Sequence, residues 1–331
     1  MTDLALFRLP DGQAWLGLGP FAEQSAQPTD SPAFYVNDFS LSDPKPWKIP
    51  AKLIQATTAQ LPDDSDLKVT WGKPATEWFK MAFRRIRREV LAGRLTKMVP
   101  VLTELGQVAT GNPASVLRRA LTSAAGTWAY GWSQGDHGFA GATPELLFQL
   151  GGGRLETMAL AGTAKPGADE AFLNDAKEIE EHEIVVRYIM EQLSTYGPVQ
   201  RGNRGMMETA GLRHFQTPLS LGNLNGKPTA DDLVKCLHPT PAVGCLPRSD
   251  EWLERLREYR QQLKVPGFFG APFGFSFQGT VHVVVAIRGV SWNGNAVSLP
   301  SGCGVVGGSA FDHEWREVRL KREAVVRSLG L

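Results

Sequence analysis

A chain of 331 residues with 42% hydrophobic content is long enough to bury a large core. Its 35 basic and 34 acidic residues give a net charge of +1 without a long block of one sign, which argues against a nucleic-acid-binding surface. No leader peptide or membrane span is indicated, and three cysteines without C-x-x-C spacing argue against a disulfide framework or zinc site, so we expect a cytoplasmic protein.

The first 75 residues are predicted to form short strands and loops. "LALFRLPDGQAWLGLGPF", residues 4–21, places a Pro-Asp-Gly turn between two segments of β character and predicts a hairpin. Residues 40–50 contain three prolines and predict irregular chain on the surface. From Thr76 the apolar spacing becomes helical, and Gly93 ends that helix.

Several strands and two helices are predicted next. "RLTKMVPVLTEL", residues 94–105, is typical of a strand. Three further strands, separated by turns, predict a meander; they are residues 126–133, 137–150 and 154–163. Apolar residues at helical intervals predict one long helix over 169–196, and a second helix is expected over 250–263.

The C-terminal part is predicted to hold a hairpin and a helix. Residues 268–300 predict a pair of strands joined around "WNGN", a type I′ turn sequence, and a helix follows over 312–329. Strands come in neighbouring runs and no repeat is visible, which favours an α+β fold of stacked antiparallel sheets over a doubly wound parallel sheet. We expect one structural domain, in which residues 1–75 are a strand and loop part and residues 76–331 the catalytic region.

"SGCGVVGGSAFDHEWREVRLK", residues 301–321, contains the spacing G-x-G-x-x-G at Gly302, Gly304 and Gly307. A dinucleotide-binding fingerprint needs a helix, then a second strand and an acidic residue about 20 residues further on. Only 24 residues remain, and they are predicted to be one helix, which argues strongly against that interpretation. Either the glycines form a plain tight turn, or their backbone N–H groups approach an anion.

Two helices carry paired glutamates. Glu314, Glu317 and, four residues on, Lys321 share one helix face, and Glu178 and Glu181 repeat the spacing in "KEIEEHEIV". Alone, each pair would be an ordinary solvated stripe. If the two faces meet, four carboxylates surround a hard cation, and Mg²⁺ suits such oxygen ligands better than Zn²⁺.

Six ordered stretches together resemble the chorismate-utilising enzymes, which include isochorismate, salicylate, anthranilate and aminodeoxychorismate synthases. They are "TPELLF" (143–148), "LAGTAKPG" (160–167), "KEIEEHEIV" (177–185), "HPTPAVG" (238–244), "VAIRGV" (285–290) and the glycine-rich stretch above. The resemblance implies a two-lobed fold with outer helices around a central pocket. It also implies Mg²⁺, with Glu181 and Glu317 matching the family's metal ligands and Glu178 and Glu314 as their neighbours.

The attacking group distinguishes the branches of this family. We expect no fused glutamine amidotransferase, and Lys97 occupies the place of the general base of the water-using branch, where anthranilate synthases generally have glutamine. Aminodeoxychorismate synthases have a lysine at the place of Ala161. The resemblance therefore favours isochorismate synthase, with Lys97 as base and Glu145 as acid. Lys97 must then be uncharged for part of the time, and Glu145 must keep a proton.

The resemblance also implies a binding site for chorismate, a dianion. Arg288 and the backbone amides near Gly302 and Gly304 would hold the enolpyruvyl carboxylate, and Lys321 would add positive charge. Thr163 and His238 would line the pocket. The alternatives are a surface-paired arginine and a purely structural histidine.

The leading hypothesis is a Mg²⁺-dependent isochorismate synthase that adds water at C2 of chorismate and expels the C4 hydroxyl. Salicylate synthase, which also eliminates pyruvate, is an alternative, and ammonia users rank third. A catalytically inactive chorismate-binding homologue is a further alternative, because Pro100 interrupts the lysine strand. The product would feed menaquinone or siderophore biosynthesis, and menaquinone is expected on prevalence. No nucleic-acid or membrane partner is expected.

Overall fold

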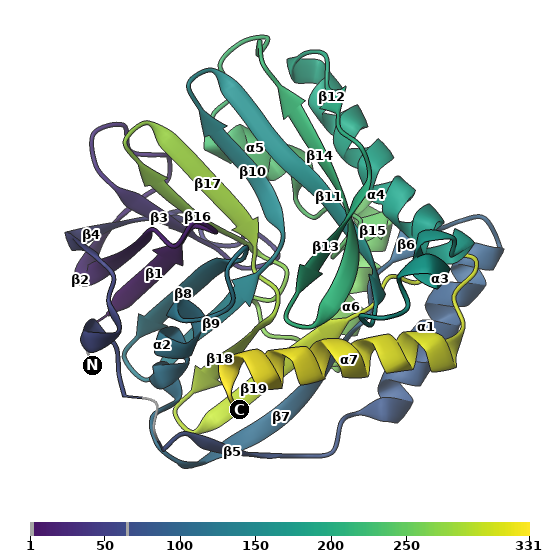
Figure 1. The fold of residues 1–331 in the computed structure, drawn as a ribbon, viewed down its shortest axis with the longest axis horizontal. Helices are drawn as coiled ribbons and strands as arrows, with labels where there is room; N and C mark the ends of the chain where they lie inside the picture. The colour runs from purple at the N-terminus through teal and green to yellow at the C-terminus, as the bar shows by residue number, and fades with distance from the viewer. Residues whose placement is uncertain (1–2, 64–65) are drawn as a thin grey trace.

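A computed structural model describes residues 3–63 and 66–331 (Figure 1). Within these ranges, 17 strands form one continuous sheet in which every pairing is antiparallel, and two short strands form a second sheet. The strands are β1 (Leu4–Arg8), β2 (Ala14–Gln24), β3 (Ala33–Val36), β4 (Trp47–Gln55), β5 (Lys68–Trp71), β6 (Lys97–Met98), β7 (Val101–Thr110), β8 (Trp128–Gln134), β9 (His137–Thr143), β10 (Leu146–Gly151), β11 (Arg154–Ala164), β12 (Gln200–Arg201), β13 (Gly205–Thr209), β14 (Leu212–Leu221), β15 (Cys245–Leu246), β16 (Pro272–Phe277), β17 (Thr280–Val285), β18 (Gly289–Asn293) and β19 (Ala296–Gly302). The predicted α+β fold of antiparallel sheets is confirmed.

Seven α-helices surround the strands in the described ranges (Figure 1). They are α1 (Thr76–Leu91), α2 (Val116–Leu121), α3 (Asp169–Leu173), α4 (Ala176–Leu193), α5 (Ala230–Leu237), α6 (Asp250–Gln262) and α7 (Phe311–Leu329), and the 3₁₀ turns are η1 (Thr58–Gln60), η2 (Pro113–Ser115) and η3 (Ser194–Tyr196). The predictions of α1, α6 and α7 are confirmed, as are the hairpins β1–β2 and β18–β19. No described helix is both long and apolar enough to cross a membrane.

The large sheet is a single ribbon of strands that curls back on itself. Its pairings run β5-β7-β19-β18-β9-β8-β1-β2-β4-β3-β16-β17-β10-β11-β14, with β12 and β13 both on β14. Aromatic rings fill the space where the ribbon folds over: Phe7 of β1 lies 5.8 Å from Phe275 of β16, centroid to centroid. Helix α4 packs on β11, and α7 packs on β19 and α2.

Two chain crossovers between distant parts of the ribbon lie side by side. At Pro144 and Glu145 the chain leaves β9, which pairs with β18, and enters β10, which pairs with β17. At residues 286–288 it passes from β17 back to β18. The Thr143 hydroxyl donates to the carbonyl of Val285 at 2.7 Å, and the Val285 amide donates to the carbonyl of Glu145 at 3.0 Å. These bonds tie the two crossovers together.

The crossovers correct two sequence predictions. Residues 137–150 are two strands that pair with different partners and not one strand of a meander, because Pro144 has no N–H to continue a ladder. Residues 268–300 contain four strands where a pair was predicted.

Three other predicted segments also differ from the structure. The strand predicted over 94–105 is broken at Pro100, so that β6 pairs with β15 and β7 pairs with β19. The helix predicted over 169–196 is interrupted: the side chain of Asp175 accepts hydrogen bonds from two amides and caps a new helix, α4. The proline-rich 40–50 segment leads into β4, where Trp47 is fully buried and donates to Asp231 at 3.0 Å.

Candidate active site

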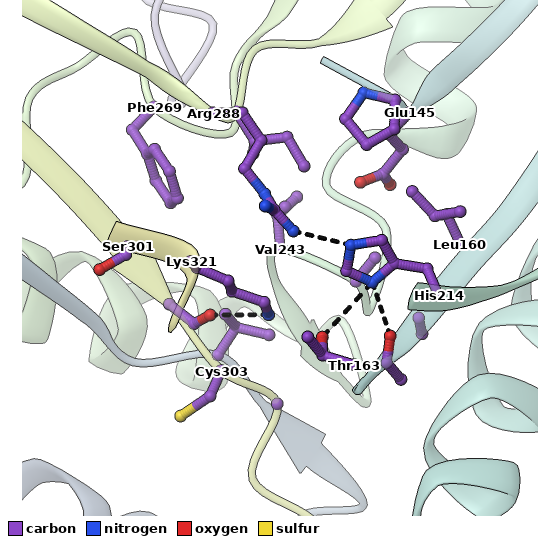
Figure 2. Close-up of a pocket in the computed structure, with 18 of the residues that line it drawn as sticks. Glu145, Leu160, Thr163, His214, Val243, Phe269, Arg288, Ser301, Cys303 and Lys321 are labelled. Carbon is purple, nitrogen blue, oxygen red and sulfur yellow. Dashed lines mark hydrogen bonds between the residues drawn. The ribbon is translucent and has the colours of Figure 1, made fainter. Parts of the chain in front are cut away.

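A cavity with about 670 Å³ of empty space, part of it open solvent, lies where the crossovers meet the end of β19 and helix α7 (Figure 2). Its walls combine apolar side chains with a few polar groups, which is typical of small-molecule sites. The lining includes Glu145, Thr163, Glu181, His214, Arg288, Gly302, Gly304 and Lys321 among its polar and glycine positions, and Val99, Leu160, Val243, Phe269 and Val325 among its apolar ones. The structure therefore brings together seven of the predicted site residues at one cavity.

Lys97 is fully buried at the start of β6, beside this cavity. Its Nζ lies 2.9 Å from Oε1 of Glu181 on helix α4. Gly304 makes room for this pair, because a Cβ on Gly304 would lie 2.0 Å from Glu181 Oε1 and 2.5 Å from Lys97 Cε. The second glycine of the sequence motif thus allows close approach of an amine and a carboxylate.

Glu145 lies at the first crossover, with 4% of its surface exposed. Burial raises the pKa of its carboxyl group to about 7, and the positive charges of Lys97, Lys321 and Arg288 only partly offset this effect. A carboxyl group with such a pKa carries a proton at neutral pH for a large part of the time. It can therefore donate that proton to a bound molecule.

Arg288 and His214 form a buried pair at the second crossover (Figure 2). Nδ1 of His214 lies 2.7 Å from the carbonyl of Gly162, and its Nε2 lies 2.8 Å from Nη2 of Arg288. This geometry fits a neutral imidazole that donates at Nδ1 and accepts at Nε2. Burial, reinforced by the charge of Arg288, holds the pKa of His214 well below its ordinary value. Nη1 of Arg288 is buried and has no hydrogen-bond partner in the described ranges, so it is available to an anion.

The backbone of Arg288 adopts a left-handed conformation, with φ of 58°. Such a φ is uncommon for a residue with a side chain and persists only where neighbours impose it. Here the Ala142 amide donates to the Arg288 carbonyl at 3.2 Å, and the Tyr130 hydroxyl donates to the carbonyl of Ile287 at 3.0 Å. Gly141 permits this contact, since a Cβ there would lie 2.7 Å from the Arg288 carbonyl oxygen.

Thr163 connects the cavity to the glutamate cluster. Its amide donates to Glu178 at 2.9 Å and its hydroxyl donates to Glu317 at 3.1 Å. Lys321 of α7 forms an ion pair with Glu317 and donates to the carbonyl of Gly302 at 3.0 Å (Figure 2). Both residues therefore fix carboxylates and also face the cavity.

Helices α4 and α7 place four buried glutamates, Glu178, Glu181, Glu314 and Glu317, around one point. The amine of Lys177 lies at that point, 2.9 Å from Glu178, 2.9 Å from Glu181, 3.0 Å from Glu314 and 4.0 Å from Glu317. Burial and the nearby charge of Glu317 raise the pKa of Glu178 to about 7. For Glu181, burial is outweighed by Lys97 and Lys177, which hold its pKa below the ordinary value. For Lys177, burial is outweighed by the four carboxylates, and its pKa is raised.

The chemistry of this cluster fits a hard cation. Among the described residues, Oε2 of Glu314 is buried without a hydrogen-bond partner, and Lys177 is the amine that faces Oε1 of Glu314 and Oε2 of Glu317, at 3.0 and 4.0 Å. Carboxylate oxygens of this kind are the ligands that Mg²⁺ takes. Ligand atoms of Glu178, His313 and Glu317 also lie within 4.8 Å of one another, so one imidazole borders the cluster.

His238 does not lie where the sequence analysis placed it. It is absent from the cavity lining, and its Nε2 lies 2.8 Å from the carbonyl of Phe39, whose ring it meets edge-on. The turn that His238 begins instead brings Ala242 and Val243 to the cavity wall. His214, which the sequence analysis missed, is the histidine of the pocket.

Lys177 and His313 were also missed. Lys177 precedes the glutamate pair in "KEIEEHEIV", where a lysine at i to i+4 spacing from Glu181 is ordinarily a surface ion pair. Nothing in the spacing of His214 distinguishes it from a structural histidine. The resemblance carried "TPELLF" and "VAIRGV" but not the "LRHFQT" stretch, which holds His214.

Similarity to known proteins extends over most of the chain. The sequence model of the family described as chorismate binding enzyme matches residues 44–330, and so begins ahead of the expected start at Thr76. A salicylate biosynthesis isochorismate synthase from Pseudomonas aeruginosa is 32% identical over 254 residues, 73% of this chain and 52% of that protein. Isochorismate synthase MenF from Bacillus subtilis is 30% identical over 226 residues, 65% of this chain and 47% of that protein. The chain thus spans about half the length of these relatives.

The fold is also similar to that of a solved structure. MenF, the menaquinone-specific isochorismate synthase from Escherichia coli, aligns with a TM-score of 0.82 at 19% identity, over 99% of this chain and 88% of that one. At this identity the likeness concerns the fold alone.

Proposed function

The chain belongs to the chorismate binding enzyme family, and on that premise we propose that it is a Mg²⁺-dependent isochorismate synthase. One observation carries the proposal. The amine of Lys97 is fully buried and lies 2.9 Å from Glu181, which lines the same cavity as Glu145 with its pKa near 7. A candidate base beside the cavity therefore lies close to a candidate metal ligand and a candidate acid in its wall.

The reaction adds water at C2 of chorismate and removes the hydroxyl at C4 while the ring double bonds shift. Lys97, in its uncharged form, takes a proton from the attacking water as the new C–O bond forms. Glu145 gives its proton to the departing hydroxyl, which leaves as water as the C4–O bond breaks. Water is gained and lost once, so that the product is an isomer of the substrate. The two residues come from different elements, β6 and the first crossover, and the proposal requires that they act on different faces of the ring.

Glu178, Glu181, Glu314 and Glu317 would hold the Mg²⁺ ion. When bound, the cation would orient the ring carboxylate and neutralise its charge. Arg288 and Lys321 would bind the enolpyruvyl carboxylate. Nη1 of Arg288 is buried without a partner in the described ranges, and Lys321 lines the same cavity. An arginine fork binds a carboxylate through two parallel bonds, which fixes the side chain of the substrate.

Product identification tests the proposal. Purified protein is incubated with chorismate, with and without Mg²⁺, and the products are separated by chromatography. We expect isochorismate only with Mg²⁺, and no product from Lys97→Ala, whereas Lys73→Ala, at an exposed lysine, should match the wild type.

The other outcomes of this experiment separate the alternatives. Salicylate as the main product would replace the proposal with salicylate synthase. A product that forms only on adding ammonium would identify an ammonia user. Chorismate binding without turnover, unchanged in Lys97→Ala, would indicate a binding protein. One relative is named for salicylate biosynthesis and one structural neighbour for menaquinone, and both names contain isochorismate synthase.

A further inference from the structure

The amine of Lys177 occupies the centre of the four-glutamate cluster. It lies within 3.0 Å of one oxygen each of Glu178, Glu181 and Glu314. These oxygens come from both helices, α4 and α7, so the lysine joins the two helices electrostatically. Only 12% of its side chain is exposed.

The start of α4 positions this side chain. Asp175 caps the helix by accepting hydrogen bonds from the amides of Lys177 and Glu178, at 2.9 and 3.1 Å. Lys177 therefore lies in the first turn, four residues before Glu181 and directly before Glu178. On its other side, a Cβ at Gly308 would lie 3.4 Å from the Lys177 side chain, so this loop borders it without blocking it.

The charges of the cluster favour one cation at a time. The Lys177 amine is the one cation that contacts carboxylates of both helices. If a divalent cation enters and Lys177 leaves, the cluster gains one positive charge. If both cations stay, it gains two, and a buried ammonium group lies against a divalent cation, which Coulomb repulsion disfavours.

The volume at the centre of the cluster also allows only one cation at a time. Mg²⁺ binds carboxylate oxygens at about 2.0–2.1 Å. An ion in contact with oxygens of Glu181 and Glu314 would share the volume that the Lys177 amine fills at 2.9 and 3.0 Å from them. The amine and the ion cannot both occupy this point.

We propose that Lys177 is an internal counter-cation that occupies the metal site of the metal-free protein and must be displaced before a divalent cation binds. The inference rests on the metal site of the proposed function and deepens it. Lys177 would then be a positioning residue that sets the affinity for metal. It would also keep the four carboxylates together when metal is scarce.

Calorimetric titration with Mg²⁺ of the wild type and of Lys177→Gln tests this proposal. We expect the variant to bind Mg²⁺ at least about tenfold more tightly, because no ammonium group has to leave. Thermal unfolding gives a second measurement. The metal-free variant should unfold at a lower temperature than the metal-free wild type, and saturating Mg²⁺ should restore it.

Lys165→Gln is the matched control, because this exposed lysine lines the outer hollow that Glu178 and Glu317 also border. It removes the same charge near the site without emptying the cluster, and its affinity for Mg²⁺ should change less than about twofold, since exposed charges are screened. Lys177→Arg retains a cation at the position and should bind Mg²⁺ no more tightly than the wild type. A Lys177→Gln protein that folds only in the presence of Mg²⁺ would support the proposal.

Equal or weaker Mg²⁺ binding by Lys177→Gln, alongside Mg²⁺-dependent isochorismate formation by the wild type, overturns the role of Lys177 and leaves the proposed function intact. Absence of Mg²⁺ binding to all four proteins overturns both.

Discussion

The side chains at the two ends of the cavity are held in place by different kinds of interaction. At one end, helices α4 and α7 and strand β6 bring together four glutamates and three lysines, which are held to one another mainly by ion pairs. At the other end, Arg288, His214 and Glu145 lie on the two crossovers, where backbone hydrogen bonds and a left-handed residue fix each side chain. The first end can rearrange when a cation enters, whereas the second is set when the sheet forms.

Under the proposed function, this difference would suit one pocket to two tasks. A reaction that moves protons needs an acid and a base at fixed positions, and backbone-fixed groups meet that requirement. A site that exchanges an ion needs side chains that can be released. Lys97 combines features of both ends. Its backbone is held in the short strand β6, and its amine pairs with Glu181 of the glutamate cluster.

Loss of Lys97 should have the largest effect. Lys97→Ala removes the base and also frees Glu181 from one of its two cations, so we expect kcat to fall toward the upper limit of general-base effects, about 10⁴-fold. The measurement is the initial rate of isochorismate formation at saturating Mg²⁺. If kcat stays within a factor of ten of the wild type, Lys97 is not the base, and the two ends of the cavity share no catalytic residue.

Glu145→Gln should lower the rate less than Lys97→Ala does, and it should make the folded protein more stable at high pH. We expect kcat to fall about 10²-fold. In the wild type, activity should decline as pH rises through about 7, because Glu145 then loses the proton it must donate. The variant should lack this decline.

The stability of the same variant sharpens the comparison. Burial raises the pKa of Glu145 from 4.5 to about 7, so ionisation of this carboxyl group destabilises the folded state. The loss of folding free energy is absent below about pH 4.5, grows as the pH rises and is complete above about pH 7. This amounts to about 3 kcal/mol, so Glu145→Gln should be the more stable protein by about that much at pH 8 and no more stable at pH 4. Denaturant unfolding at both pH values measures this difference, and a gap that does not change with pH would contradict it.

Arg288→Lys should have the smallest effect of the three. Lysine keeps the charge and bears the same left-handed backbone cost, but it has no planar fork, so KM for chorismate should rise about tenfold with kcat nearly unchanged. Arg154→Lys, at an exposed strand position, is the control. A fall in kcat without a rise in KM would mean that Arg288 positions His214 and does not bind a carboxylate.

Regular, periodic segments of the fold were predictable from the sequence. Helices α1, α6 and α7 and the hairpins at each end of the chain follow from apolar spacing and turn residues. The breaks were not predictable to the same degree. Pro144, Pro100 and Asp175 each divide a segment that is apolar throughout, and periodicity does not show where a ladder changes its partner.

The site residues also fall into a predictable group and an unpredictable group. Lys97, Glu145, Thr163, Arg288 and the glutamate pairs were predicted from their motifs, and the structure brings them to one region. His238 was misplaced because the chain turns after it and points its ring at Phe39. Lys177 was overlooked because its spacing from Glu181 is that of an exposed pair, and only the approach of α7, far away in sequence, turns that pair into a buried cluster.

The adjoining crossovers have a mechanical consequence. Hydrogen bonds among Thr143, Val285 and Glu145 join the ladder β9–β18 to the ladder β10–β17, so a hinge that moved these two parts of the sheet apart would have to break those bonds. We therefore expect turnover to proceed in a rigid frame, with ligands entering past moving side chains and surface loops. The amide proton of Val285, which bonds to the carbonyl of Glu145, should then exchange equally slowly in the free and the ligand-saturated protein.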